Sequence, residues 1–144
     1  MEVQVSLGIA EGVSEDLLRS AICLVMDKNG ITGGEISLAL LGDQAIRELN
    51  RIYLGQDRPT DVIAFALHEE GESVLGDVYI GYEQAMYQAG EMDIPLTEEI
   101  VRLVIHGTLH VLGHEHPDTE VISLNSEMFQ LQEEFLQELL DEAS

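Results

Sequence analysis

A cluster of histidines in the C-terminal third of the chain constrains the fold more than any other feature. The segment HGTLHVLGHEH places His110 four residues after His106, and His116 six residues after His110. If the segment begins on a helix, residues four apart share one face and can contact one ion. A helix that ends at Gly113 can reverse direction there, because glycine adopts left-handed backbone conformations without strain. We therefore expect a helix over residues 98–112 and a turn that returns His116 to the first two histidines.

This spacing predicts a catalytic zinc site in which His106, His110 and His116 bind one Zn²⁺ ion. Three neutral imidazoles with an open fourth position are typical of catalytic zinc, whereas structural zinc is usually closed by four ligands. His114 is the alternative third ligand, because it would follow His110 by one turn if the helix continued. Gly113 argues against that continuation, and a fourth ligand at His114 would close the site.

The same segment matches the zinc-protease pattern HExxHxxGxxH, except that Gly107 stands in place of the glutamate. Peptidases of this type need that glutamate as general base, so the substitution opposes a zinc-dependent peptidase. Glycine inside a helix also costs about 1 kcal/mol relative to alanine. Either a substrate or a neighbouring strand must therefore approach the helix closely at Gly107, and the sequence leaves both alternatives open.

Size and charge limit the classes of protein to which the chain can belong. We expect its 144 residues to form a single domain, residues 1–144. The formal net charge of −22 opposes broad electrostatic attraction to DNA, RNA or anionic lipid. The single cysteine cannot form an internal disulfide, and no apolar run is long enough to span a membrane. Because the N-terminus also lacks a basic signal region, we expect a cytoplasmic protein with no membrane and no DNA partner.

A local cluster of arginines offers an exception to the acidic character of the chain. Three of the six basic residues fall within twelve positions, and arginine binds phosphate well. One interpretation is an RNA-binding surface; the other is a solvated helix face on which Arg47 and Arg51 pair with Glu48 or Asp43. The candidate substrate-binding residues are Arg51, Arg58 and, one helical turn before His106, Arg102.

Hydrophobic patterning predicts an α+β fold with a mixed sheet of about four strands. Alternating or short apolar segments predict strands over residues 1–10, 35–41, 60–67 and 74–81. Apolar positions at helical spacing predict helices over residues 15–28, 43–55, 82–90, 98–112 and 118–140. Ser14 and Asp43 are expected to cap the first two helices. The third and fourth strands are expected to pair antiparallel, and the zinc-protease-like histidine helix should be the buried central helix.

Three stretches of the chain together resemble the signature segments of a known family. They are LNRIYLGQDRPTDVIAFAL, VLGDVYIGYEQA and HGTLHVLGHEH, and the match spans about residues 45–135. In this order they resemble the YbeY family of bacterial rRNA-maturation endoribonucleases. The resemblance implies a cytoplasmic, zinc-dependent, single-strand endoribonuclease that acts in 16S rRNA 3′-end maturation and ribosome quality control. It also implies that His106, His110 and His116 are the zinc ligands.

The chain departs from the family pattern at two places. The family usually has Tyr-Arg-Gly where this chain has Tyr-Leu-Gly, so Leu54 replaces an arginine that is held to be important for catalysis. Arg51 or Arg58 is a candidate to supply the missing charge. The family commonly has tyrosine and aspartate where this chain has His114 and Glu115. Glu115 keeps a carboxylate and is a candidate catalytic residue. Arg58 is the other candidate, because it could supply the missing positive charge. His114 is a further candidate metal ligand.

The predicted metal site fits functions of different classes. In metal-assisted RNA cleavage, zinc polarises a phosphoryl oxygen or lowers the pKa of its bound water to about 7. An arginine would then stabilise transition-state charge, and Glu115 would shuttle a proton. The alternative is a non-catalytic, zinc-stabilised ribosome assembly factor that binds a small-subunit ribosomal protein or an assembly GTPase through its acidic surface, whereas the enzyme would act on rRNA. Unfolding of the protein on zinc removal would favour that alternative.

Overall fold

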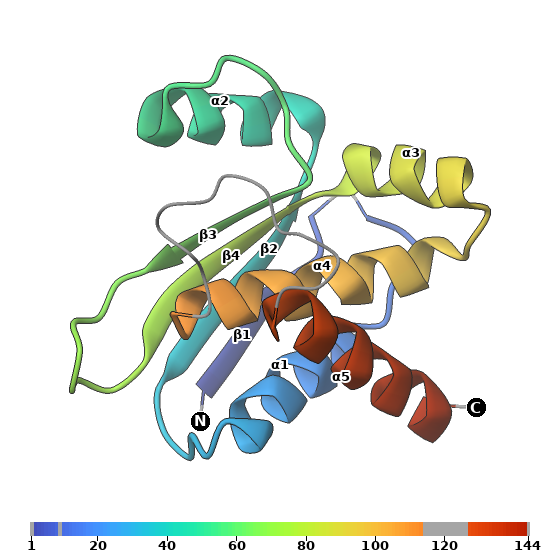
Figure 1. The fold of residues 1–144 in the computed structure, drawn as a ribbon. Coiled ribbons are helices and arrows are strands. Elements are labelled where there is room, and N and C mark those ends of the chain that lie inside the picture. Colours follow the sequence, from blue (N-terminus) through green and yellow to red (C-terminus); the bar gives the residue numbers. More distant parts are fainter. Residues whose placement is uncertain (1, 9, 114–126, 144) are drawn as a thin grey trace.

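The computed structural model describes residues 2–8, 10–113 and 127–143. Within these ranges the chain forms four strands and five helices (Figure 1). In chain order they are β1 (Glu2–Ser6), α1 (Glu15–Lys28), β2 (Glu35–Leu41), α2 (Asp43–Leu54), β3 (Val62–Ala66), β4 (Leu75–Gly81), α3 (Tyr82–Met92), α4 (Leu96–Val111) and α5 (Glu127–Ala143). The predicted α+β class is confirmed.

The strands form one mixed sheet in the order β1-β2-β4-β3. β1, β2 and β4 are parallel, whereas β3 pairs antiparallel with β4 at one edge. Parallel neighbours need a crossover connection, which α1 supplies between β1 and β2. Both the mixed sheet and the antiparallel pairing of the third and fourth strands are confirmed.

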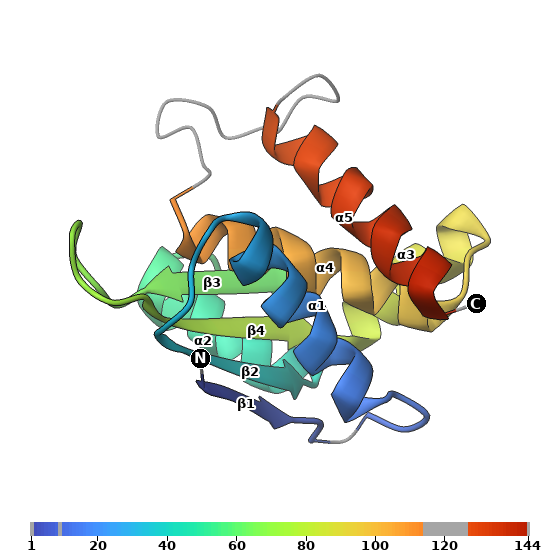
Figure 2. The ribbon, with the colours of Figure 1, turned by 90° about the horizontal axis from the view of Figure 1, so that it is seen from below.

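Helices α1, α4 and α5 lie together on one side of the sheet (Figures 1 and 2). α4 contacts α1, α3, α5 and both antiparallel strands, and it is the central helix that its apolar sequence predicts. Its fully buried side chains include Ile100, Val104, Ile105 and Leu109. None of the helices in the described ranges is long and apolar enough to cross a membrane.

Of the two predicted helix caps, one is confirmed and the other is wrong. The side chain of Ser14 accepts a hydrogen bond from the Leu17 backbone N–H at 3.2 Å, as an N-cap does. Asp43 is instead the first residue of α2, after Gly42. The exposed Asp43 N–H donates to Oε1 of Glu83 on α3 at 3.0 Å. A carboxylate from the neighbouring helix therefore replaces the local cap.

Helix α4 ends where the sequence predicts, and the turn expected to return His116 lies outside the described residues. Leu112 is the C-cap, and Gly113 follows with a φ of 89°, in the left-handed region. The predicted start of the last helix, at about residue 118, lies outside the described residues. In the described part of α5 the buried line consists of Gln132, Phe135, Leu136 and Leu139.

Candidate metal centre

Helix α4 presents His106 and His110 on one face, one turn apart. Their Nε2 atoms are 2.9 Å apart, and the ring centroids are 4.6 Å apart in an edge-to-face arrangement. Two imidazole nitrogens bound tetrahedrally to one zinc ion, each at about 2.0–2.1 Å, lie about 3.3 Å apart. The two Nε2 atoms would therefore need to move apart by only a few tenths of an ångström to bind one ion between them. The structure brings these two residues together, and their binding of zinc stays a prediction.

The remaining predicted ligands lie outside the described residues. This applies to His116, to the alternative ligand His114 and to the candidate catalytic residue Glu115. Among the residues that the structure does describe, no group of three His, Cys, Asp or Glu side chains is placed to hold a metal ion. A three-ligand site on the histidine pair therefore needs a donor from the segment after Gly113.

The environment of His106 favours its neutral form. Burial lowers the pKa of the imidazole, and the neighbouring His110 lowers it further. A hydrogen bond to Gln132 and the negative charge of Asp61 act in the opposite direction but do not reverse the shift. Neutral imidazole is the form that binds metal ions. The chemistry of the described donors therefore fits a zinc ion.

Gly107 faces strands β3 and β4 of the sheet. A Cβ atom at this position would lie 2.6 Å from Cγ1 of Val78 on β4 and 3.2 Å from Cγ2 of Val62 on β3. The neighbouring strands therefore require the glycine, which decides between the two alternatives that the sequence left open. A glutamate here would be directed into the packed interface between α4 and the sheet, so a zinc-protease general base has no place at this position.

Substitution of Gly107 by alanine is expected to destabilise the protein by up to about 2 kcal/mol. Overpacking costs about 1–3 kcal/mol, and the better helix propensity of alanine offsets about 1 kcal/mol of that cost. The matched control is Gly90→Ala in α3, where an added Cβ meets nothing within 4 Å among the described atoms. Urea unfolding should show Gly90→Ala to be neutral or stabilising. Equal effects of the two substitutions would contradict the close packing at Gly107.

The histidine pair opens into a hollow of about 240 Å³ at the edge of the sheet. Val62, Ile63 and Ala64 of β3 form one wall, and Leu54 at the end of α2 lines the opening. The Leu54 side chain is 53% exposed. Leu54, which stands where the resembled family usually has arginine, therefore lines the same hollow as the two histidines and offers no positive charge.

The arginines proposed to bind substrate lie in different surroundings. Arg51 pairs with Glu48 on the exposed face of α2, with 2.8 Å between Nη2 and Oε2. This is the solvated pair that the sequence offered as an alternative, although Arg47 pairs with Asp57 and not with Asp43. None of these arginines lines the histidine hollow.

Arg102 lies between α4 and α5 and binds three carboxylates. Its Nη1 donates to Oε1 of Glu99 at 2.8 Å, and its Nε donates to Oε2 of Glu133 at 3.0 Å. A carboxylate oxygen of Glu98 is 3.6 Å away from Nη2. Glu99 is only 3% exposed, and burial raises its pKa although Arg102 acts to lower it. The structure therefore gives Arg102 a role in joining the helices, and the substrate contact predicted for it stays a prediction.

Arg58 lies in the loop between α2 and β3, which a buried asparagine holds in place. Nδ2 of Asn50 donates to the carbonyl oxygen of Arg58 at 2.9 Å, and Asn50 is 4% exposed. The carbonyl oxygen of Asn50 accepts from the backbone N–H of Gln56 at 3.1 Å. The Arg58 side chain itself is exposed and makes no polar contact with any residue that the structure describes. Its charge is therefore available to a ligand.

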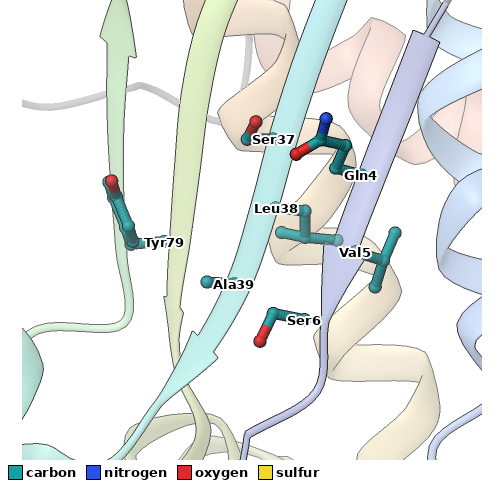
Figure 3. A pocket seen from close by; sticks show the side chains of 7 residues that line it. All are labelled: Gln4, Val5, Ser6, Ser37, Leu38, Ala39 and Tyr79. Atoms are coloured by element: carbon teal, nitrogen blue, oxygen red, sulfur yellow. The ribbon is translucent and has the colours of Figure 1, made fainter.

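A second hollow lies on the sheet, over β1, β2 and β4 (Figure 3). Its lining includes the small residues Ser6, Ser37 and Ala39, with Tyr79 at one side. The Tyr79 hydroxyl donates to a carboxylate oxygen of Asp77 at 3.2 Å. No histidine, carboxylate or arginine belongs to this lining. The hollow at the histidines, unlike this one, is lined by side chains that can bind a metal ion.

Two residues near the histidines were not predicted from the sequence. Gln132 of α5 contacts His106 directly. Asp61 raises the pKa of His106 through its charge, and its Oδ2 accepts from Nε2 of Gln88 at 3.1 Å. The sequence feature that could have indicated Gln132 is its polar side chain at a position of the last helix where the helical spacing predicts an apolar residue. No local pattern marks Asp61, which follows Thr60 at a bend directly before β3.

Comparisons with known proteins identify relatives of this chain. A family model described as "Endoribonuclease YbeY" matches residues 4–140. The Endoribonuclease YbeY of Bacillus velezensis is 38% identical over 141 residues, which cover 88% of this chain and 88% of the relative. That of Persephonella marina is 37% identical over 127 residues, covering 82% and 83%. The solution structure of TM1509 from Thermotoga maritima is similar with a TM-score of 0.68 and 31% identity, over 97% of this chain and 90% of that one.

Proposed function

The chain belongs to the YbeY endoribonuclease family, and from this we propose that it is a zinc-dependent endoribonuclease of single-stranded RNA. Its proposed roles are 16S rRNA 3′-end maturation and ribosome quality control in the cytoplasm, with residues 1–144 acting as one domain. The observation that carries the proposal is the pair His106 and His110, which line one hollow with their Nε2 atoms 2.9 Å apart.

The proposed metal ligands are His106, His110 and His116, which together would hold one Zn²⁺ ion. A zinc ion held by three imidazoles supplies Lewis-acid stabilisation of negative charge and acidifies water near neutral pH. This chemistry suits phosphodiester cleavage because negative charge accumulates on the phosphoryl oxygens. It also removes the need for the glutamate that zinc peptidases place where this chain has Gly107.

The arginines near α2 are the proposed phosphate contacts. Arg58 has no polar partner among the described residues, so it can bind phosphate without giving up another contact. Arg51 is paired with Glu48 at the surface. Such exposed pairs contribute only about 0–1 kcal/mol, so a phosphate can compete for Arg51. Glu115 is the proposed proton shuttle.

The substrate class is tested by cleavage of two oligonucleotides of identical sequence, one RNA and one DNA, by zinc-loaded protein. We expect internal cleavage of the RNA and none of the DNA, because recognition or attack would use the ribose 2′-hydroxyl. Annealing the RNA to its complement should protect it. Equal cleavage of RNA and DNA would contradict the proposed specificity.

Substitution of Leu54 by arginine is expected to raise the rate of RNA cleavage by about 10- to 100-fold. The added guanidinium would lie beside the histidines and stabilise charge in the transition state, and such donors contribute about 10²–10³-fold when they are well placed. Leu54→Met is the matched control, because it changes shape without adding charge. Measured initial rates that are the same for the arginine and methionine variants would show that charge at this position has no part in cleavage.

A non-catalytic assembly factor is the alternative function. It is favoured by Leu54, which removes the family's usual arginine, and by the net charge of −22, which suits a basic ribosomal protein or an assembly GTPase better than bare RNA. Circular dichroism before and after zinc removal separates the two. Folded protein that has lost cleavage supports the enzyme, and unfolding supports the assembly factor.

A further inference from the structure

We propose that Gln132 fixes the ring orientation and the tautomer of His106, as the last link of a hydrogen-bonded relay that begins at Arg102. Gln132 is a positioning residue, since it acts through His106 and contacts no reacting atom. The inference rests on the proposed role of His106 as a zinc ligand. It adds a part of the site that comes from α5, a helix distant in sequence from the histidine pair.

The amide of Gln132 is buried between two polar partners. Its side chain is 6% exposed. Oε1 lies 2.7 Å from Nδ1 of His106, and Nε2 lies 3.0 Å from Oε2 of Glu133. Both ends of the amide are therefore engaged, and the group cannot rotate without losing both contacts.

The chemistry of these partners sets the direction of each hydrogen bond. A carboxylate only accepts, so the amide nitrogen of Gln132 must be the end that faces Glu133. The amide oxygen then faces His106, and because this oxygen only accepts, Nδ1 of His106 must carry the proton. A neutral imidazole has one proton. Nε2 of His106 therefore keeps its lone pair, and this is the nitrogen that faces His110 at 2.9 Å.

Arg102 keeps Glu133 in the accepting role. The guanidinium binds both oxygens of Glu133, with Nε 3.0 Å from Oε2 and 3.3 Å from Oε1. Its Nη1 is held by the buried Glu99 at 2.8 Å. Arg102 and Glu99 lie on α4, as His106 does, whereas Glu133 and Gln132 lie on α5. The relay therefore also ties the position of α5 to the orientation of the histidine ring.

This arrangement prepares His106 for metal binding before any ion arrives. In the opposite tautomer the proton would sit on Nε2, where the ion is proposed to bind. Partners of the second ring nitrogen fix tautomer and orientation at metal sites in general, and their loss typically reduces metal affinity or activity about 10- to 100-fold. We expect a loss of that size when Gln132 cannot accept a hydrogen bond.

The test compares Gln132→Met with wild type in the full-length, metal-free protein. Methionine has a similar length and is apolar, so it can fill the buried site without accepting from Nδ1. Long-range ¹H–¹⁵N correlation of the imidazole rings, at a pH where they are neutral, shows which nitrogen carries the proton. We expect Nδ1–H in the wild type and a substantial Nε2–H population in Gln132→Met. Zinc affinity, measured by chelator competition, should fall about 10- to 100-fold. Gln130→Met, at an exposed position of the same helix, should change neither property.

Two further variants separate this role from simple packing. Gln132→Glu keeps an acceptor for Nδ1–H, so the wild-type tautomer should persist. Glu133→Gln permits the Gln132 amide to turn over, so mixed tautomers should appear although Gln132 is intact. An unchanged tautomer in both Gln132→Met and Glu133→Gln would overturn the inference. Failure of the wild type to bind zinc would instead refute the proposed function, while the tautomer measurement would still decide the role of Gln132.

Discussion

Replacing His110 by alanine is expected to remove tight zinc binding and to reduce RNA cleavage by more than about 100-fold. His110 is one of two proposed ligands that the structure describes, with its Nε2 2.9 Å from that of His106. Mutation of residues that hydrogen-bond to metal ligands typically reduces metal affinity or activity about 10- to 100-fold, and removal of a ligand itself should reduce them more. Alanine is the best helix former, so α4 should persist.

Zinc content by mass spectrometry and initial cleavage rates check this expectation, with circular dichroism as the test of folding. His68→Ala is the matched control, because His68 lies in the loop between β3 and β4 and accepts from the Leu75 backbone N–H at 3.1 Å. The control should retain both zinc and cleavage. A His110→Ala protein that binds one zinc ion and cleaves normally would show that the metal lies elsewhere.

Replacing Arg102 by methionine is expected to lower the free energy of unfolding by about 3–5 kcal/mol, as breaking one side of a buried ion pair does. Glu99 is 3% exposed and would lose its closest positive partner, now at 2.8 Å. Glu133 would lose its contact as well. Urea unfolding measures the change. Arg51→Met, which breaks an exposed pair on α2, is the control and should change stability by no more than about 1 kcal/mol.

The pH dependence of the Arg102→Met variant follows from Glu99. Burial raises the pKa of Glu99 above its ordinary value of 4.5 in the folded protein. Between the ordinary pKa and the raised pKa, Glu99 is protonated in the folded protein and ionised in the unfolded protein. Glu99 therefore lowers the free energy of unfolding as pH rises through this interval. Without Arg102 the effect should grow. The difference between wild type and variant should thus be larger near pH 7 than near pH 4.5, and a pH-independent difference would contradict the account of Glu99.

Local patterns account for the features that the sequence predicts well. The four-residue spacing brings His106 and His110 together because a helix repeats every 3.6 residues. Gly113 ends the helix because it takes a φ of 89°. Alternation places β2 and β4, since every second side chain of each of these strands is buried. Each of these features depends on residues that are close together in the chain, so the sequence alone is enough to predict it.

Features that depend on how elements meet could not be predicted. Arg102 lies one turn before His106, which suggested a substrate contact, but α5 covers it with Glu133. Gln132 reaches His106 across the same interface. The N-terminus of α2 is satisfied by Glu83 of α3 and not by a residue of its own. In each case the partner is far away in sequence, and no spacing rule connects the two.

Zinc-dependent cleavage is tested most directly by the RNA-cleavage rate of metal-stripped protein as zinc is added back in measured equivalents. We expect no cleavage without metal and a linear rise in rate that ends at one zinc ion per chain, with no recovery in His110→Ala. Full cleavage by the stripped wild type, or none at any zinc content, would contradict this expectation.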